Sequence, residues 1–235
     1  MSEAIPYIII IGVVLFLIIS IATSRSRIRR IYRRYMNMPN SLDLTGKEFA
    51  FISKRNLRLS NLKFALTNIE LGDAYSSKSK TLIMSEQVCN TASIASIAIV
   101  AHELGHAVQD KNNNFLLRLT HLFRKITKVT NKFIIPSLLV SLICFLVDSI
   151  DIQLCLTFLY IGSILFVFHI FNHLLCIPLE HGASKIAMRY LKMCKGFKLK
   201  EYDKISYLLN VAVQTYIASF FDDVFLFVFK RRKWC

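Results

Sequence analysis

Three long apolar runs constrain the fold of this chain more strongly than any other feature of its sequence. They cover residues 5–22, 134–147 and 154–175. A helix of roughly 20 apolar residues is long enough to cross the hydrocarbon core of a bilayer, and the first and third runs meet this requirement. Because 54% of all residues are hydrophobic and many of them lie in these runs, we expect an integral membrane protein.

The charges beside these runs predict their orientation. No Lys or Arg precedes residues 5–22, whereas six arginines lie within residues 25–34. Positive charge collects on the cytoplasmic side and a cleavable signal peptide has the opposite charge order, so we expect an uncleaved anchor with its N-terminus outside. Residues 133–176 are expected to form a transmembrane hairpin, because the acidic turn at 148–151 joins two apolar runs with basic residues on both outer sides.

The rest of the chain favours helices, with one small α+β part. Residues 42–56 have the apolar spacing of a helix with Thr45 as its N-cap, while residues 62–71 and 80–85 have the composition of strands. We therefore expect a mainly α protein with three to four transmembrane helices. The predicted segments after the anchor are a cytoplasmic part (25–132), the hairpin, a cytoplasmic helix (177–204) and an apolar C-terminal helix (205–230) whose crossing of the membrane the sequence leaves open.

Residues 98–110, AIVAHELGHAVQD, contain the pattern H-E-x-x-H within a predicted helix of residues 91–110. Four residues make just over one helical turn, so His102 and His106 lie on one face and can bind a single metal ion. Two neutral imidazoles and a third protein ligand suit Zn²⁺, with a fourth position left for water. Glu103 follows the first histidine, where its carboxylate can take a proton from that water, so the pattern predicts metal-assisted hydrolysis.

The alternative is that the two histidines are ordinary surface residues of a helix. The apolar residues around them argue against this, because polar side chains among apolar neighbours need partners. Gly105 supports the same conclusion. A glycine costs about 1 kcal/mol inside a helix relative to alanine, which is explained if another element packs against the backbone there. We therefore favour the metal site.

The third ligand must come from another part of the chain. We favour Glu180, because Pro178 can begin a helix that carries Glu180 in its first turn. Its facing stripe would be Ala183, Ala187 and Leu191. One predicted hairpin separates this helix from H-E-x-x-H, so both are expected on the same side of the membrane. The residues considered for the role are Asp110, Glu180, His181 (the second choice), Glu201 and Asp203.

The chain resembles the YugP-type neutral zinc metallopeptidases, a family of bacterial membrane proteins. The resemblance implies a zincin-like helical core, with His102, His106 and Glu180 as zinc ligands and Glu103 as the catalytic base. The family commonly has Asp or Asn two residues after the ligand Glu, where this chain has Gly182, although Ser184 matches. The segments that carry the similarity are LTGKEFA (44–50), KTLIMSEQVCNTASIASIAIVAHELGHAVQD (80–110), IPLEHGASKIAMRYL (177–191) and NVAVQTYIA (210–218).

Two further features of the apolar runs have a simpler explanation than metal binding. His169 and His173 are four residues apart, but we favour an intramembrane or interfacial pair that is hydrogen-bonded to its neighbours over a second metal pair. The six cysteines show no C-x-x-C pairing, and three of them lie within the predicted hairpin, residues 133–176. We expect these cysteines to be small buried apolar residues, without a disulfide framework.

Two functions remain after these observations. The first is a zinc-dependent endopeptidase at the cytoplasmic face of the cell membrane, acting on a peptide or membrane-protein substrate whose extended backbone pairs with the strand TLIMS, residues 81–85. The second is a non-catalytic membrane scaffold or assembly factor that retains a zinc site. It is considered because Gly182 replaces the polar residue that the family commonly has at this position. The net charge is +15, and the Lys and Arg residues that produce it flank the apolar runs. This placement suits contact with membrane lipid, so no nucleic-acid partner is expected.

Overall fold

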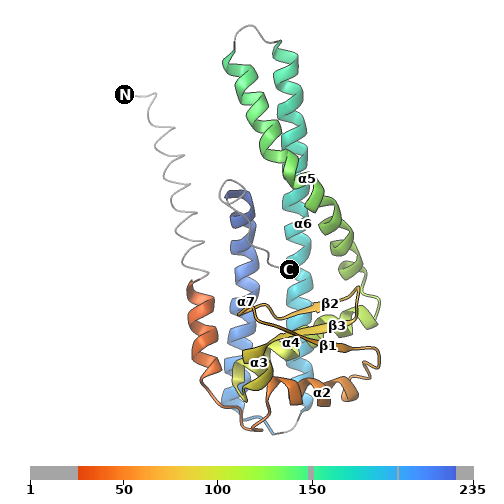
Figure 1. The fold of residues 1–235 in the computed structure, drawn as a ribbon, viewed down its shortest axis with the longest axis vertical. Coiled ribbons are helices and arrows are strands. Elements are labelled where there is room, and N and C mark those ends of the chain that lie inside the picture. Colours follow the sequence, from red (N-terminus) through yellow and green to blue (C-terminus); the bar gives the residue numbers. More distant parts are fainter. Residues whose placement is uncertain (1–25, 148–150, 195, 226–235) are drawn as a thin grey trace. The chain divides into compact units, whose positions relative to one another are not determined.

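The structure is a computed structural model that describes residues 26–147, 151–194 and 196–225 (Figure 1). It is mainly helical with one small sheet, as the sequence predicts. The predicted anchor at residues 5–22 lies outside the described residues, as do residues 226–230. Residues 26–36 are helical. The labelled elements are α2 (Gly46–Asn56), β1 (Lys63–Thr67), β2 (Ala74–Ser76), β3 (Thr81–Ser85), α3 (Glu86–Asn90), α4 (Ile94–Lys111), α5 (Phe115–Leu146), α6 (Ile152–Met193) and α7 (Leu199–Phe225).

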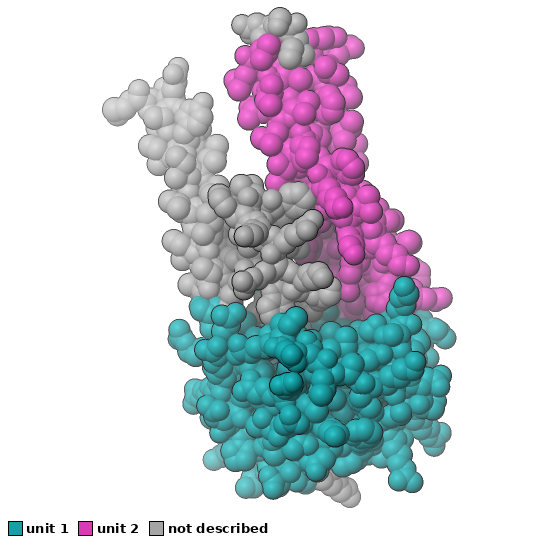
Figure 2. All heavy atoms as spheres, viewed as in Figure 1, with its two compact units in different colours: residues 1–113, 180–235 teal, residues 114–179 magenta. Residues whose placement is uncertain are grey.

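The chain divides into two compact units (Figure 2). Unit 1 combines residues 1–113 with residues 180–235, and unit 2 consists of residues 114–179. The long helix α6 therefore contributes to both units. All three predicted zinc ligands belong to unit 1.

The sheet of unit 1 has the strand order β1-β3-β2. Strand β1 runs parallel to β3 over its whole length, and β2 pairs antiparallel with residues 81–83 of β3 on the other side. The predicted docking strand TLIMS is therefore central: β1 covers one of its edges over the whole length, and β2 covers residues 81–83 of the other edge. The sequence pattern predicted no strand at residues 74–76. In the structure these residues form β2 and pair with one edge of β3, so β1 and β2 are the outer strands.

The core of unit 1 forms where apolar faces of its helices meet. Helix α2 begins at a capping box: the Thr45 hydroxyl accepts from the Glu48 backbone N–H, and the Glu48 carboxylate accepts from the Thr45 N–H. This confirms Thr45 as the N-cap, a device that satisfies two backbone donors at the helix start. The larger fully buried side chains of this core are Tyr32, Phe49, Leu82, Ile94, Ile97, Leu104, Leu191 and Ile205.

Unit 2 is a hairpin of two antiparallel helices. The Ser141 hydroxyl donates to the Cys155 carbonyl at 3.0 Å near its tip, and further down the Phe123 and Phe168 rings stack 4.8 Å apart. Both helices are long and apolar enough to cross a membrane, and only 22% and 17% of their apolar windows are buried. Side chains exposed over such a length suit lipid. Within the described residues, α5 and α6 are the two candidate transmembrane helices. The sequence predicts three to four such helices in the whole chain.

Both prolines of the hairpin lie inside helices, which corrects one prediction. The sequence favours a new helix beginning at Pro178, but α6 continues through it, so Glu180 lies deep in a 42-residue helix. Helix α5 likewise continues through Pro136, so most of the apolar run at 134–147 is the C-terminal part of one 32-residue helix that begins at Phe115. Proline removes one helical hydrogen bond and can be tolerated where the flanking residues hold the helix together by packing.

Candidate metal centre

The structure brings His102 and His106 of α4 together with Glu180 of α6. Their ligand atoms all lie within 4.8 Å of one another. Glu180 Oε2 is 3.1 Å from His102 Nε2 and 3.3 Å from His106 Nε2, so both rings point the same nitrogen at one carboxylate oxygen. The side chains are 13%, 12% and 5% exposed in the order His102, His106 and Glu180. A buried cluster of two imidazoles and one carboxylate therefore joins two elements far apart in the sequence.

Helix α4 sets the spacing of the two histidines. Ser93 caps it by accepting from the Ser96 backbone N–H at 3.0 Å, so the helix begins at Ile94 and not at residue 91 as predicted. The residues around the motif are apolar and buried, which fixes the rotation of the helix. The two imidazoles stand edge to face with their centroids 4.9 Å apart, as positions four residues apart on one helix require.

Gly105 allows α6 to approach α4 closely. A Cβ atom at this position would lie 2.5 Å from the carbonyl oxygen of Ala183. This explains the glycine in the middle of an apolar helix, as the sequence predicts. Ala183, Ala187 and Leu191 are buried on the facing stripe of α6, which confirms that stripe. Small residues on both helices thus bring Glu180 within reach of the histidines.

Replacing Gly105 with alanine is expected to force the two helices apart. The new methyl group meets backbone atoms, which cannot rotate away, so the free energy of unfolding should fall by about 1–3 kcal/mol. Zinc binding should weaken in the protein that still folds. Thermal unfolding together with zinc content measures both effects. Gly182→Ala is the control for the stability measurement, because its Cβ would meet only the end of the flexible Gln109 side chain and should cost much less stability. Equal stability losses in the two variants would contradict this account.

The outer nitrogens of the two rings also have partners. Ser184 Oγ lies 3.2 Å from His102 Nδ1, and Gln109 Oε1 lies 3.0 Å from His106 Nδ1. An amide oxygen only accepts, so His106 Nδ1 carries a proton, which leaves Nε2 as the nitrogen that would bind a metal. Sequence reasoning found Ser184 but missed Gln109. The signal was the position of Gln109 three residues after His106, on the same face of the helix.

Burial and charge shift the acidities of the site in ways that suit a cation. Burial raises the pKa of Glu103, although the two histidines beside it lower it. Burial lowers the pKa of His106, but hydrogen bonding and charge from Glu180 outweigh it and raise the pKa to about 9. Burial opposes ionisation of Glu180, yet hydrogen bonds from His102 and His106 hold its pKa below the usual range. Positive charge is therefore favoured between the carboxylate and the imidazoles.

The other candidates for the third ligand have different roles. Asp110 Oδ2 accepts from Tyr75 Oη and Lys80 Nζ, both at 2.6 Å, and so ties α4 to the sheet. Glu201 accepts from two backbone N–H groups, that of Lys198 just before α7 and that of Ser41 in the segment before α2. The remaining two candidates, His181 and Asp203, are exposed. Glu180 is thus the candidate that the structure brings to the motif.

The donor set fits zinc. Two imidazole nitrogens and one carboxylate oxygen are a ligand set of catalytic zinc sites, in which three protein ligands leave one position open. Within the described part of the chain, no second group of three metal-binding side chains is found. His169 and His173 lie with ring centroids 4.7 Å apart on α6, and no third ligand joins them there.

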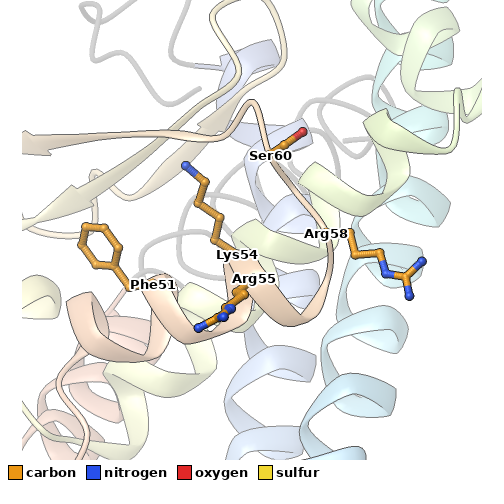
Figure 3. A pocket seen from close by; sticks show the side chains of 5 residues that line it. All are labelled: Phe51, Lys54, Arg55, Arg58 and Ser60. Atoms are coloured by element: carbon orange, nitrogen blue, oxygen red, sulfur yellow. The ribbon is translucent and has the colours of Figure 1, made fainter.

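A hollow of about 410 Å³ lies on unit 1 outside the metal centre (Figure 3). It lies on α2 and the turn that follows. Figure 3 shows Lys54 and Arg58 projecting in different directions, so their charges do not converge on one point. Its lining residues are Phe51, Lys54, Arg55, Arg58 and Ser60, none of which belongs to the cluster.

A mainly helical chain with a buried His–His–Glu group on H-E-x-x-H has the features of a zinc metallopeptidase. Residues 7–229 match the family model described as "Putative neutral zinc metallopeptidase", and the chain belongs to this family. It is also similar to "Putative membrane protease YugP" of Bacillus subtilis (strain 168), with 27% identity over 215 residues that cover 87% of this chain and 90% of that protein. No solved structure matches the chain. The resemblance seen in the sequence is therefore confirmed, and zinc is the metal of the family.

Proposed function

We propose that this protein is a zinc-dependent membrane endopeptidase in which His102, His106 and Glu180 hold the metal. The observation that carries the proposal is the convergence of both Nε2 atoms on Glu180 Oε2 in a buried cluster. Zinc bound there would supply Lewis-acid polarisation of a water molecule and of the scissile carbonyl. The histidines and Glu180 would fix its position, and three protein ligands would leave a fourth position for water or substrate.

Glu103 is proposed as the general base and then the general acid. Its carboxylate takes a proton from the attacking water as the water oxygen bonds to the peptide carbonyl carbon. It then returns that proton to the nitrogen as the C–N bond breaks, which yields a free amine and a new carboxyl group. Burial raises the pKa of Glu103, which makes it a better proton acceptor at neutral pH.

The outer strand β2 is our candidate for the edge that holds the substrate backbone. Helix α4 packs against β2, and the hydrogen bond from Tyr75 to Asp110 joins them beside the H-E-x-x-H turn. An extended peptide added at an outer strand would be held by backbone hydrogen bonds, with little dependence on sequence. This assignment moves the predicted docking edge from β3 to its neighbour.

The membrane assignment rests on the hairpin and on the charges around it. Glu180 follows the end of the apolar run at 154–175 by only five residues of the same helix. Basic residues precede and follow the hairpin, which favours the cytoplasmic side for both ends. We therefore propose a multi-pass protein with its N-terminus outside and its active site at the cytoplasmic face. Its substrates would be membrane proteins or peptides close to the bilayer.

Removal and return of zinc test the proposed activity. The purified full-length protein in detergent should cleave an unfolded protein or a quenched peptide mixture, lose this activity with a zinc chelator, and regain it with about one equivalent of zinc. Cleavage that persists after complete removal of zinc would contradict the proposal. Zinc-loaded protein that cleaves none of these substrates, nor membrane proteins in its own lipid, would instead favour the non-catalytic scaffold.

A further inference from the structure

Gln109 is a buried polar residue whose amide lies against a proposed zinc ligand. It is 3% exposed, and its Oε1 accepts from His106 Nδ1 at 3.0 Å. Burying an amide costs free energy unless it is hydrogen-bonded, and an aliphatic side chain would fill the same space without that cost. The polar group at this position is therefore explained by the imidazole that it contacts.

Gly182 provides the space for this amide. A Cβ atom built on Gly182 would lie 2.9 Å from Gln109 Nε2, which is closer than real Cβ atoms approach. Gly182 is on α6, two residues after Glu180, whereas Gln109 is on α4, three residues after His106. The glutamine of one helix thus fits into a gap that the glycine of the other helix leaves open.

From this geometry we infer that Gln109 is a positioning residue for His106, seated in the gap at Gly182. By accepting from Nδ1–H, it holds the ring in the tautomer and orientation that direct Nε2 at the metal. Ser184 makes the corresponding contact with His102 Nδ1 from α6. Partners of this kind fix the orientation of a ligating histidine and increase its donor strength. The inference rests on the proposed ligand role of His106.

The same geometry explains how the gap at Gly182 affects a histidine that Gly182 does not touch. An added methyl group at 182 would displace the Gln109 amide and so weaken its hold on His106. Once Gln109 is shortened to alanine, the methyl group meets nothing there. An asparagine at 182 would begin where the Gln109 amide ends, so its own amide oxygen could replace the missing acceptor from the opposite helix.

Zinc affinity of the full-length protein in detergent, measured by competition with a chromogenic chelator, tests these statements. Gln109→Ala should bind zinc roughly 10- to 100-fold more weakly, while Gln109→Glu, which keeps an acceptor, should retain most of the affinity. Gly182→Ala should lose part of the affinity alone and cause no further loss in the Gln109→Ala background. Gly182→Asn should recover affinity in that background. The visible spectrum of the cobalt-substituted protein should change in Gln109→Ala and recover in the rescued variant.

The exposed Gln87 is the matched control, because it accepts a hydrogen bond from Tyr32 and touches no ligand. Gln87→Met should leave zinc affinity and the cobalt spectrum unchanged. Unchanged affinity in Gln109→Ala, or independent and additive losses for Gln109→Ala and Gly182→Ala, would overturn the positioning role alone. A wild-type protein that binds no zinc, or keeps it in His106→Ala, would reject the proposed metal centre and this inference with it.

Discussion

Replacing Glu103 with glutamine is expected to abolish peptide hydrolysis while zinc remains bound. The amide has nearly the shape of the carboxylate but cannot take a proton from water or return it to the leaving amine. General acid–base catalysis by one side chain typically contributes 10²- to 10⁴-fold, and we expect a loss in about this range or beyond it, because Glu103 would serve both steps. Turnover measured beside the zinc content of the same sample separates catalysis from metal binding.

The control for this change is another Glu→Gln substitution in unit 1. Glu86 lies exposed in the first turn of α3, away from the cluster, so Glu86→Gln should leave both turnover and zinc unchanged. Wild-type turnover in Glu103→Gln would reject Glu103 as the base. Loss of zinc in Glu103→Gln would show that this carboxylate binds the metal instead.

Replacing Glu180 with alanine is expected to remove zinc and, with it, all hydrolysis. Two imidazoles alone would remain, and they would also lose the charged group that both of them contact. Three protein ligands are the usual minimum for a catalytic zinc site, so occupancy should fall from about one zinc per chain to background. Metal analysis after dialysis against a weak chelator measures the occupancy.

A second buried carboxylate supplies the control for Glu180. Glu201 is similarly buried, but it accepts from the backbone N–H groups of Ser41 and Lys198 and not from a histidine. Glu201→Gln should reduce thermal stability without changing the zinc content of the folded protein. Retention of zinc by Glu180→Ala, with loss in Glu201→Gln, would show that the third ligand is wrongly assigned.

Features that depend on local sequence could be predicted without the structure. The capping box at Thr45 and the helical spacing of His102 and His106 each depend on residues a turn or less apart. Glu180 is 74 residues beyond His106, yet the predicted topology restricted the choice, because a single transmembrane hairpin would return the chain to the same side. Gly105 was informative for a similar reason, since an unexplained glycine in a helix indicates a close neighbour.

Features that depend on tertiary packing could not be predicted in the same way. Whether Pro178 begins a helix or lies inside one is decided by packing around it, and local propensity favours the first. The central place of β3 depends on the return of residues 74–76, a strand too short to show a pattern. The partnership of Gln109 with the gap at Gly182 appears only when α4 and α6 lie together. From the sequence alone, Gly182 indicates that a polar side chain beside the metal ligands is missing. In the structure, the Gln109 amide fills the space beside Gly182 and contacts His106.

X-ray absorption at the zinc edge of the purified wild-type protein tests the central claim most directly. We predict about one zinc per chain, bound by two imidazole nitrogens and one carboxylate oxygen at roughly 2.0–2.2 Å, with a further light atom from solvent. The imidazole contribution should fall in His106→Ala. A site dominated by sulfur at about 2.3 Å would place the metal on the cysteines, and a protein free of zinc would remove the basis of the proposed hydrolysis. Either result would contradict the assignment of His102, His106 and Glu180 as the metal centre.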